Sequence, residues 1–403
     1  MLDMSLNHIT DVFSPVIVDV AKIVKSTKRK KELISFGQGI PFYNPPDFAL
    51  DELITTLKGS ENFIHRYTVD EGLPELIELI LKRHATKGRT NLTRENIIVT
   101  AGANLAFYLA LTSITSYGDE VIIPTPFYFN HVMGVEILQC KPVLIPRLSN
   151  LDLDIAQIEK SITKKTKAIV ITSPDNPTGS IYSKERLEQI FDLAEKHNLW
   201  IIHDETYEEF IYEGQTAPHF SMLNFEPNER KRVISVFSFS KIFGMSGYRA
   251  GYLIFPSKLY YNLLKLQDTI IVNCPVVSQV LVKTMLIQEQ ETTKWFQTKF
   301  NQLREVRKYI LEEISSSNFF EIEKNSLSGL GGFYLFPKIT SSKYQNRSFD
   351  LIKCLIEEQD TVLLPGNGFG DDWNNYVRIS FGNVNMAQVE EGFSRLKEFF
   401  KNN

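Results

Sequence analysis

The stretch KAIVITSPDNPTGSIYSKERLEQIFDLAEKHNLWIIHDETY, residues 167–207, decides the fold. Its segments KAIVIT and LWIIH are short and almost continuously apolar, as strands buried on both faces of a sheet are. Between them, a helix is predicted that starts at the capping residue Ser183 and places Leu187 and Ile190 on one face. This order predicts two parallel strands joined by a crossover helix.

The same pattern continues on both sides of this stretch. Further strands are predicted in NIIVT, EVIIP, KPVLIP, RVISVF and AGYLIF, between about residues 96 and 255. We therefore expect an α/β large domain with a three-layer, mainly parallel, seven-stranded sheet, over residues 48–285. Charged helical patterns and few strands after about residue 285 predict a smaller α+β domain, residues 1–47 and 286–403. The segment before Lys25 is expected to form an amphipathic lid helix.

The composition is that of a globular protein without an extreme charge. Of 403 residues, 43% are hydrophobic, and 44 basic against 48 acidic residues give a net charge of −4. This balance argues against a nucleic-acid or membrane-surface partner. Cys140, Cys274 and Cys354 show no disulfide or metal-ligand spacing, which favours a reducing compartment. With no leader pattern at the N-terminus, we expect a cytoplasmic protein.

Polar side chains follow several predicted strands at the edge where ligands bind an open parallel sheet. NIIVT leads into Gly102, Ala103 and Asn104 at a helix N-terminus, which offers backbone N–H groups to an anion, although many such turns bind nothing. EVIIP leads into Phe127 and Tyr128, and such aromatic residues are more often core than ligand contacts. KAIVIT leads into SPDNPTG, where turn chemistry alone explains the composition.

Two further strand ends carry charged groups. Asp204 comes one residue after an apolar run, and a buried carboxylate there needs a metal, a cation or a protonated ring nitrogen as its partner. The neighbouring residues show no His/Cys pattern for a metal. RVISVF leads into SFSKIFGMSGYRAG, in which Lys241 supplies an amine and Arg249 a guanidinium. Arginine suits bidentate anion binding, and a desolvated lysine near other cations becomes a nucleophile.

Together these strand ends offer an anion site, an aromatic face, an amide, a carboxylate with a phenol, and an amine with an arginine. Pyridoxal 5′-phosphate requires this set of groups. The chain resembles the class I/II aminotransferases of the fold type I pyridoxal-phosphate enzymes, of the aspartate/kynurenine aminotransferase kind. The resemblance runs almost end to end through ISFGQGIP, HRYTVDEGLPEL, TAGAN, PTPFY, SPDNPTG, HDETY, SFSKIFGMSGYRAG, GGFYLFP and YVRISFG.

The resemblance implies roles for individual residues. Lys241 would bind the cofactor as a Schiff base and move the substrate's α-proton, and Asp204 would pair with the pyridine nitrogen. Asn176 and Tyr207 would hydrogen-bond the ring oxygen, and Tyr128 would stack on the ring. The phosphate would be held by Gly102, Ala103, Asn104, Ser238, Ser240 and Arg249.

The resemblance also implies how substrate and subunits are arranged. Arg378 would grip the substrate's α-carboxylate, assisted by Asn176 and the backbone at Gly39. Tyr67 would reach the phosphate of the neighbouring subunit, which makes a homodimer with shared active sites the expected assembly. Ser173 and Asp175 depart from residues common in the family, and TAGAN lacks hydroxyls that some members use on the phosphate.

The reaction itself is left with alternatives. An aminotransferase working by a ping-pong mechanism is expected, but the same fold and cofactor also serve lyases, cyclases, racemases, decarboxylases and oxidases. A non-catalytic regulator that binds the cofactor is a further alternative, but it would need an additional DNA-binding domain. The GQGIP and PFY motifs favour the kynurenine/glutamine branch of the family, and the sequence does not identify the amino acid.

Overall fold

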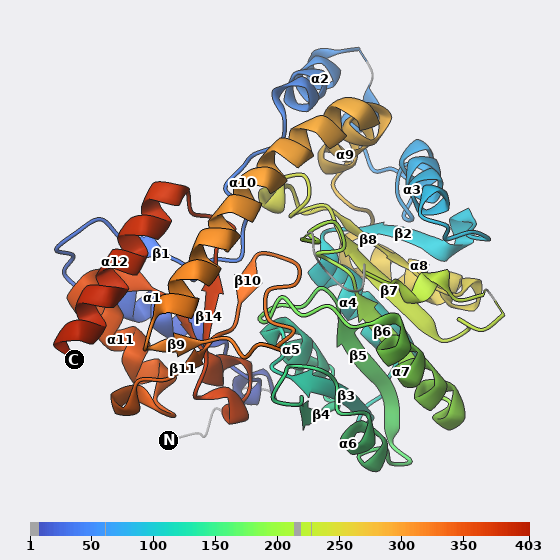
Figure 1. Cartoon of the computed structure of the whole chain (residues 1–403). Coiled ribbons are helices and arrows are strands. Elements are labelled where there is room, and N and C mark those ends of the chain that lie inside the picture. The colour runs from blue at the N-terminus through green and yellow to red at the C-terminus, as the bar shows by residue number, and fades with distance from the viewer. Residues whose placement is uncertain (1–7, 61, 213–218, 227) are drawn as a thin grey trace, which may run out of the picture.

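A seven-stranded sheet forms the centre of the larger part of the molecule (Figure 1). A computed structural model of the chain describes residues 8–60, 62–212, 219–226 and 228–403. The strands follow the order β2 (Ile97–Thr100), β8 (Gly251–Ile254), β7 (Val233–Ser238), β6 (Trp200–Asp204), β5 (Thr166–Thr172), β3 (Glu120–Thr125) and β4 (Lys141–Pro146). Only β8 runs antiparallel to its neighbours, β2 and β7. The predicted mainly parallel sheet of seven strands is confirmed.

Helices cover both faces of this sheet, because alternate side chains of each buried strand point to opposite faces. On β5, Ala168 and Val170 belong to one apolar cluster, whereas Ile169 and Ile171 belong to another. The first cluster includes side chains of α4 and α8, and the second includes side chains of α7. The helices of this part are α3 (Pro74–Thr86), α4 (Ala103–Ile114), α5 (Phe129–Ile137), α6 (Ile155–Lys160), α7 (Lys184–His197), α8 (Tyr260–Ile271) and α9 (Val276–Ile287).

The crossover helix α7 forms where the sequence predicts it. The Ser183 side chain caps its N-terminus by accepting a hydrogen bond from the backbone N–H of Arg186, at 3.2 Å. Leu187 and Ile190 are buried against the sheet. Asn198 ends the helix in the left-handed conformation, with φ of 56°. The helix therefore connects β5 to β6 and brings the ends of both strands to the same edge.

The smaller α+β part combines the N-terminal arm with the C-terminal third of the chain (Figure 1). Strand β1 (Ile34–Ser35) pairs in parallel with β12 (Thr361–Val362). A second sheet has the order β10 (Tyr334–Leu335), β14 (Val377–Ser380) and β13 (Leu364–Pro365), and β9 (Phe320–Glu321) pairs with β11 (Lys338–Ile339). Helices α1 (Val16–Ser26), α11 (Ser348–Gln359) and α12 (Met386–Asn402) belong to this part, and the long helix α10 (Glu289–Ser316) extends from it towards α9 (Figure 1). Helix α2 (Asp47–Lys58) packs against α9 of the larger part.

The pairing of β1 with β12 joins the N-terminal arm to the C-terminal part of the chain. The division of the chain at residues 47/48 and 285/286 stays a prediction. The segment GGFYLFPKI, residues 331–339, contains two short strands, because β10 ends at Leu335 and β11 begins at Lys338. Pro337 lies in the gap and has no backbone N–H to give to a ladder. Of the segment before Lys25, residues 16–24 are helical as part of α1, whereas residues 1–7 lie outside the described residues. The role of this helix as a lid stays a prediction. Among the described residues, no helix is both long and apolar enough to cross a membrane.

Candidate active site

A cavity of about 190 Å³ lies at the carboxyl ends of the parallel strands, between the sheet and the smaller domain. Most of the predicted site residues line it: Gly39, Ala103, Asn104, Tyr128, Asn176, Asp204, Tyr207, Ser238, Ser240, Lys241, Arg249 and Arg378. Gly102 is the N-cap of α4, directly before the lining residue Ala103. Tyr67 lies apart from the cavity, and its side chain is 83% exposed.

Lys241 projects into this cavity from the loop after β7. Its Nζ donates a hydrogen bond to the backbone carbonyl of Gly39, at 2.7 Å. Burial and the positive charges of Arg249 and Arg378 lower the pKa of the Lys241 amine to about 8. A lysine with such a pKa carries a much larger neutral fraction near neutral pH than a solvated lysine does. It can therefore act as a nucleophile and as a general base.

Asp204 ends β6 as a buried carboxylate in the wall of the cavity. His131 Nε2 lies 3.1 Å from its Oδ2, and the backbone N–H of Thr206 donates to its Oδ1 at 3.0 Å. Burial raises the pKa of Asp204, but the hydrogen bonds and the neighbouring imidazole outweigh burial, so that the pKa lies below its usual value. Asp204 is therefore an anion at neutral pH, as the partner of a protonated ring nitrogen must be.

Arg378 reaches the cavity from β14 of the smaller domain. Its Nη1 donates to Asn176 Oδ1 at 3.0 Å, and its Nη2 donates to the carbonyl of Gly37. The guanidinium carbon lies 5.0 Å from the ring centre of Tyr334. The side chain is buried, and its Nε has no hydrogen-bond partner among the described residues. A guanidinium has five N–H donors, and the bonds to Asn176 and Gly37 use only two of them, so Arg378 is suited to bind a carboxylate in the cavity.

Comparison with known proteins places this cavity in a family. Residues 31–396 match the family model described as aminotransferase class I and II. The chain belongs to this family. Aspartate aminotransferase of Pyrococcus horikoshii is 31% identical over 381 residues, 94% of this chain and 93% of that protein. A transaminase of Methanocaldococcus jannaschii named for (5-formylfuran-3-yl)methyl phosphate is 31% identical over 384 residues, 95% of this chain and 96% of the relative.

Solved structures agree with the family assignment. A Methanococcus jannaschii protein, described as similar in its active site to kynurenine aminotransferases, shares 30% identity with this aminotransferase and has a TM-score of 0.86. The comparison covers 98% of this chain and 100% of that one. The chain of 403 residues is therefore a pyridoxal-phosphate-dependent aminotransferase of fold type I.

The residues of the aminotransferase cavity fit that cofactor's phosphate. Arg249, Ser238 and Ser240 lie in the cavity wall beside the N-terminus of α4, where backbone N–H groups favour an anion. Gly102 has φ of 85°, and a side chain there would overlap the guanidinium of Arg249. The glycine thus lets a guanidinium and a helix N-terminus meet at one point. This combination of donors is suited to a dianionic group.

Two neighbouring aromatic residues, Phe127 and Tyr128, follow β3, and the structure places them differently. The ring of Tyr128 lines the cavity, and its hydroxyl accepts a hydrogen bond from Asn130 Nδ2 at 2.8 Å. Phe127 lies in the apolar core of the large domain, 5.7 Å from the ring of Phe13. Of the two, Tyr128 is therefore the one that lines the cavity. Its stacking on the cofactor ring stays a prediction.

Asp175, one of the two residues that depart from the family pattern, does not line the cavity. Its carboxylate accepts two hydrogen bonds from the Arg147 guanidinium, at 2.9 and 3.2 Å, and a third from Thr178 Oγ1 at 2.6 Å. Both charged side chains are buried. The pair holds the loop that carries the next residue, Asn176, so this departure acts behind the cavity and not on its surface.

Several lining residues were not singled out from the sequence: Ile17, Phe129, Thr172, Thr206 and Tyr334. Tyr334 lies in the GGFYLFP motif, which carried the resemblance without a role for any single residue. Ile17 lies on α1, next to Val16, which packs against Gly368. Nothing in the local sequence distinguishes Ile17 from the other apolar residues of that helix. His131, the partner of Asp204, likewise has no local signal.

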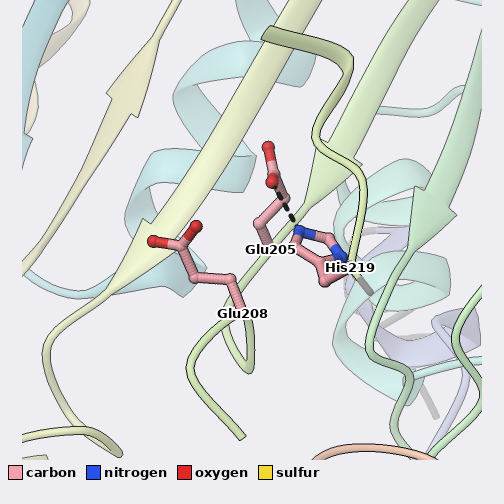
Figure 2. A group of neighbouring side chains, drawn as sticks. All are labelled: Glu205, Glu208 and His219. Atoms are coloured by element: carbon pink, nitrogen blue, oxygen red, sulfur yellow. Dashed lines mark hydrogen bonds and ion pairs between the residues drawn. The ribbon is translucent and has the colours of Figure 1, made fainter. Parts of the chain in front are cut away.

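Figure 2 shows a second polar cluster, which follows β6 directly and consists of Glu205, Glu208 and His219. Glu205 binds His219 Nε2 and Ser221 Oγ, each at 2.8 Å. The guanidinium of Arg89 lies 2.9 Å from Glu208 and 3.6 Å from Glu205. Each carboxylate thus faces a buried cation. We interpret the cluster as an ion-pair network that fixes the turn after β6, and we assign it no metal.

Proposed function

We propose that this aminotransferase moves the amino group of an L-α-amino acid to a 2-oxo acid, in two alternating half-reactions at the cavity around Lys241. One observation carries this proposal. A lysine amine with a lowered pKa and a buried guanidinium line the same cavity. The arginine is suited to hold an α-carboxylate, and the lysine is suited to accept the α-proton of the same substrate.

The chain's residues would hold the cofactor as follows. Lys241 binds it covalently, Asp204 accepts a hydrogen bond from the ring N–H, and Tyr128 stacks on the ring. Asn176 and Tyr207 donate to the ring oxygen. The phosphate is bound by Gly102, Ala103, Asn104, Ser238, Ser240 and Arg249. Pyridoxal phosphate, when bound, supplies an electron sink for the electron pair that the α-carbon releases.

Two residues decide which bond of the substrate is broken. Arg378, with Asn176 and the backbone at Gly39, fixes the carboxylate, so the carboxylate is held and does not leave. Lys241, once its amine is free, takes the proton from the α-carbon. The carbonyl of Gly39, 2.7 Å from Nζ, holds the free amine within the cavity. The geometry favours proton removal over decarboxylation, and it leaves elimination and cyclisation as reactions to be tested.

A panel of amino acids tests the proposed reaction. The holoenzyme is mixed with each amino acid in the absence of a 2-oxo acid, and its visible spectrum and released products are followed. Aspartate, aromatic amino acids and kynurenine are tested first, because the names or descriptions of relatives include them. We expect one amino group transferred per chain, reversed by a 2-oxo acid. Continuous release of ammonia, carbon dioxide or a cyclised product without an acceptor would instead establish a lyase or cyclase.

The Arg378→Lys variant tests the carboxylate site. Lysine keeps the charge but loses the two-pronged hydrogen bonding of a guanidinium. Weakening one partner of a buried charge pair costs about 2–5 kcal/mol, so kcat/KM for the amino acid is expected to fall by about 30-fold to about 5,000-fold. Arg347→Lys, at an exposed ion pair with Asp350 at the start of α11, is the control and should be active. Equal kcat/KM values in the two variants would refute the assignment of Arg378.

We also propose a homodimer that shares its active sites through Tyr67. A tyrosine that is 83% exposed is an unusual surface residue and is available to a partner subunit. Mixing inactive Lys241→Ala chains with Tyr67→Ala chains tests this, because a mixed dimer regains one complete site only if Tyr67 acts across the interface. Activity above the sum of the two separate variants is expected.

The three free cysteines support our proposal of a cytoplasmic location.

A further inference from the structure

Tyr334 and Tyr207 form a buried pair of hydroxyls in the wall of the cavity. Their Oη atoms lie 2.6 Å apart, which is a short and well-formed hydrogen bond. Tyr334 belongs to β10 of the smaller domain, whereas Tyr207 follows β6 of the large domain. Both side chains line the cavity. Among the described residues, the hydroxyl of Tyr334 has no hydrogen-bond partner other than Tyr207.

The backbone and the side chains around Tyr334 fix the position of its hydroxyl. β10 pairs with β14, the strand that carries Arg378, and the Arg378 guanidinium covers the Tyr334 ring at 5.0 Å. A side chain at Gly39 would overlap the Tyr334 hydroxyl, so the glycine allows the N-terminal arm to pass close to it. The phenol is thereby held from three sides and is fully buried.

The number of protons in this pair limits what each hydroxyl can do. Burial raises the pKa of both phenols above the usual value, so both are protonated at neutral pH. Each hydroxyl has one proton to donate. If the hydroxyl of Tyr207 donates its hydrogen bond to Tyr334, Tyr207 has no donor left for a ligand. If the hydroxyl of Tyr334 donates a hydrogen bond to Tyr207, the O–H of Tyr207 is free to point into the cavity and to donate to a ligand there.

We propose that Tyr334 is a positioning residue. Its hydroxyl donates a hydrogen bond to the oxygen of Tyr207, and the hydroxyl of Tyr207 is thereby directed to donate a hydrogen bond to the ring oxygen of the cofactor. This inference rests on the role proposed above for Tyr207. A hydroxyl that accepts one hydrogen bond becomes a better donor in the next, because the bonds in a chain polarise one another. Tyr334 therefore strengthens the hydrogen bond that stabilises a negative charge on the ring oxygen.

The Tyr334→Phe variant tests the inference, because it removes the hydroxyl and keeps the ring. The readout is the pH midpoint of the visible absorption of the holoenzyme, which depends on the charge of the ring oxygen and not on turnover. We expect this midpoint to rise by about 0.5 to 1 pH unit, the size that a weakened hydrogen bond produces. Tyr212→Phe is the matched control: its hydroxyl is also buried, but it donates to Gly332 O and does not line the cavity.

The double variant Tyr207→Phe/Tyr334→Phe shows whether Tyr334 acts through Tyr207. If it does, adding Tyr334→Phe to Tyr207→Phe produces no further shift of the midpoint. A full second shift in the double variant would overturn the inference, and so would an unchanged midpoint in Tyr334→Phe. An unchanged midpoint in Tyr207→Phe alone would instead refute the role proposed for Tyr207, and the inference with it.

Discussion

Replacing Lys241 by alanine is expected to lower the rate of the half-reaction by about 10⁴-fold or more, since general acid–base and nucleophilic roles are lost together. The structure offers no substitute amine: among the described residues, the other basic groups that line the cavity are the guanidinium groups of Arg249 and Arg378. Cofactor is still expected to bind non-covalently, because the other predicted cofactor-binding residues are retained. Single-turnover absorbance measurements with a good amino acid donor give the rate.

The pH dependence of the wild type provides an independent check on Lys241. The amine is protonated below its pKa of about 8 and neutral above it. Because only the neutral amine attacks an aldehyde, attachment of pyridoxal phosphate to the apoenzyme should speed up with rising pH and level off above about pH 8. Lys353→Ala, an exposed lysine on α11, should behave as the wild type. A rate in Lys241→Ala within tenfold of the wild type would contradict the assignment.

The Asp204→Asn variant is expected to lower kcat/KM by about 10³-fold, while its side-chain shape is conserved. Two unit charges 4 Å apart at an effective dielectric constant of 20 interact by about 4 kcal/mol, and the neutral amide forfeits this attraction to a protonated ring nitrogen. The rate of α-proton removal should fall much more than the affinity for the cofactor. Transient kinetics and cofactor titration measure the two effects separately.

Asp192→Asn, an exposed carboxylate on α7, is the control for Asp204→Asn and should have wild-type kinetics. Thermal unfolding of the apoenzyme shows whether the loss of the His131 contact affects folding. If Asp204→Asn folds, binds the cofactor and reacts at the wild-type rate, the carboxylate has no part in the chemistry and the orientation proposed for the ring is wrong.

The sequence predicted the sheet well because buried parallel strands leave a strong local signal. KAIVIT and LWIIH are apolar on both faces, and the helix between them has an N-cap at Ser183 and an apolar face against the sheet. By contrast, β10 and β11 are two residues long each, and their pairing depends on partners far along the chain. Local patterns do not contain that information.

The cavity was predictable to the extent that its residues follow strands. Lys241 and Asp204 lie at or just after strand ends, and the topology of a parallel sheet brings such positions together. Tyr334 and Ile17 reach the cavity from the smaller domain, and their contribution depends on how that domain docks. Asp175 shows the reverse case, since a residue inside a recognisable motif is turned away from the cavity by Arg147.

If the proposal is right, the cofactor is bound to Lys241 in this cavity and leaves that lysine when an amino acid reacts. Sodium borohydride fixes the cofactor to whichever lysine holds it, and peptide mass spectrometry then locates the modified residue. We expect one modified lysine per chain, Lys241, and loss of the modification when the holoenzyme is first treated with a competent amino acid and no 2-oxo acid. Modification of a different lysine, or of Lys241 to the same extent after that treatment, would contradict the proposal.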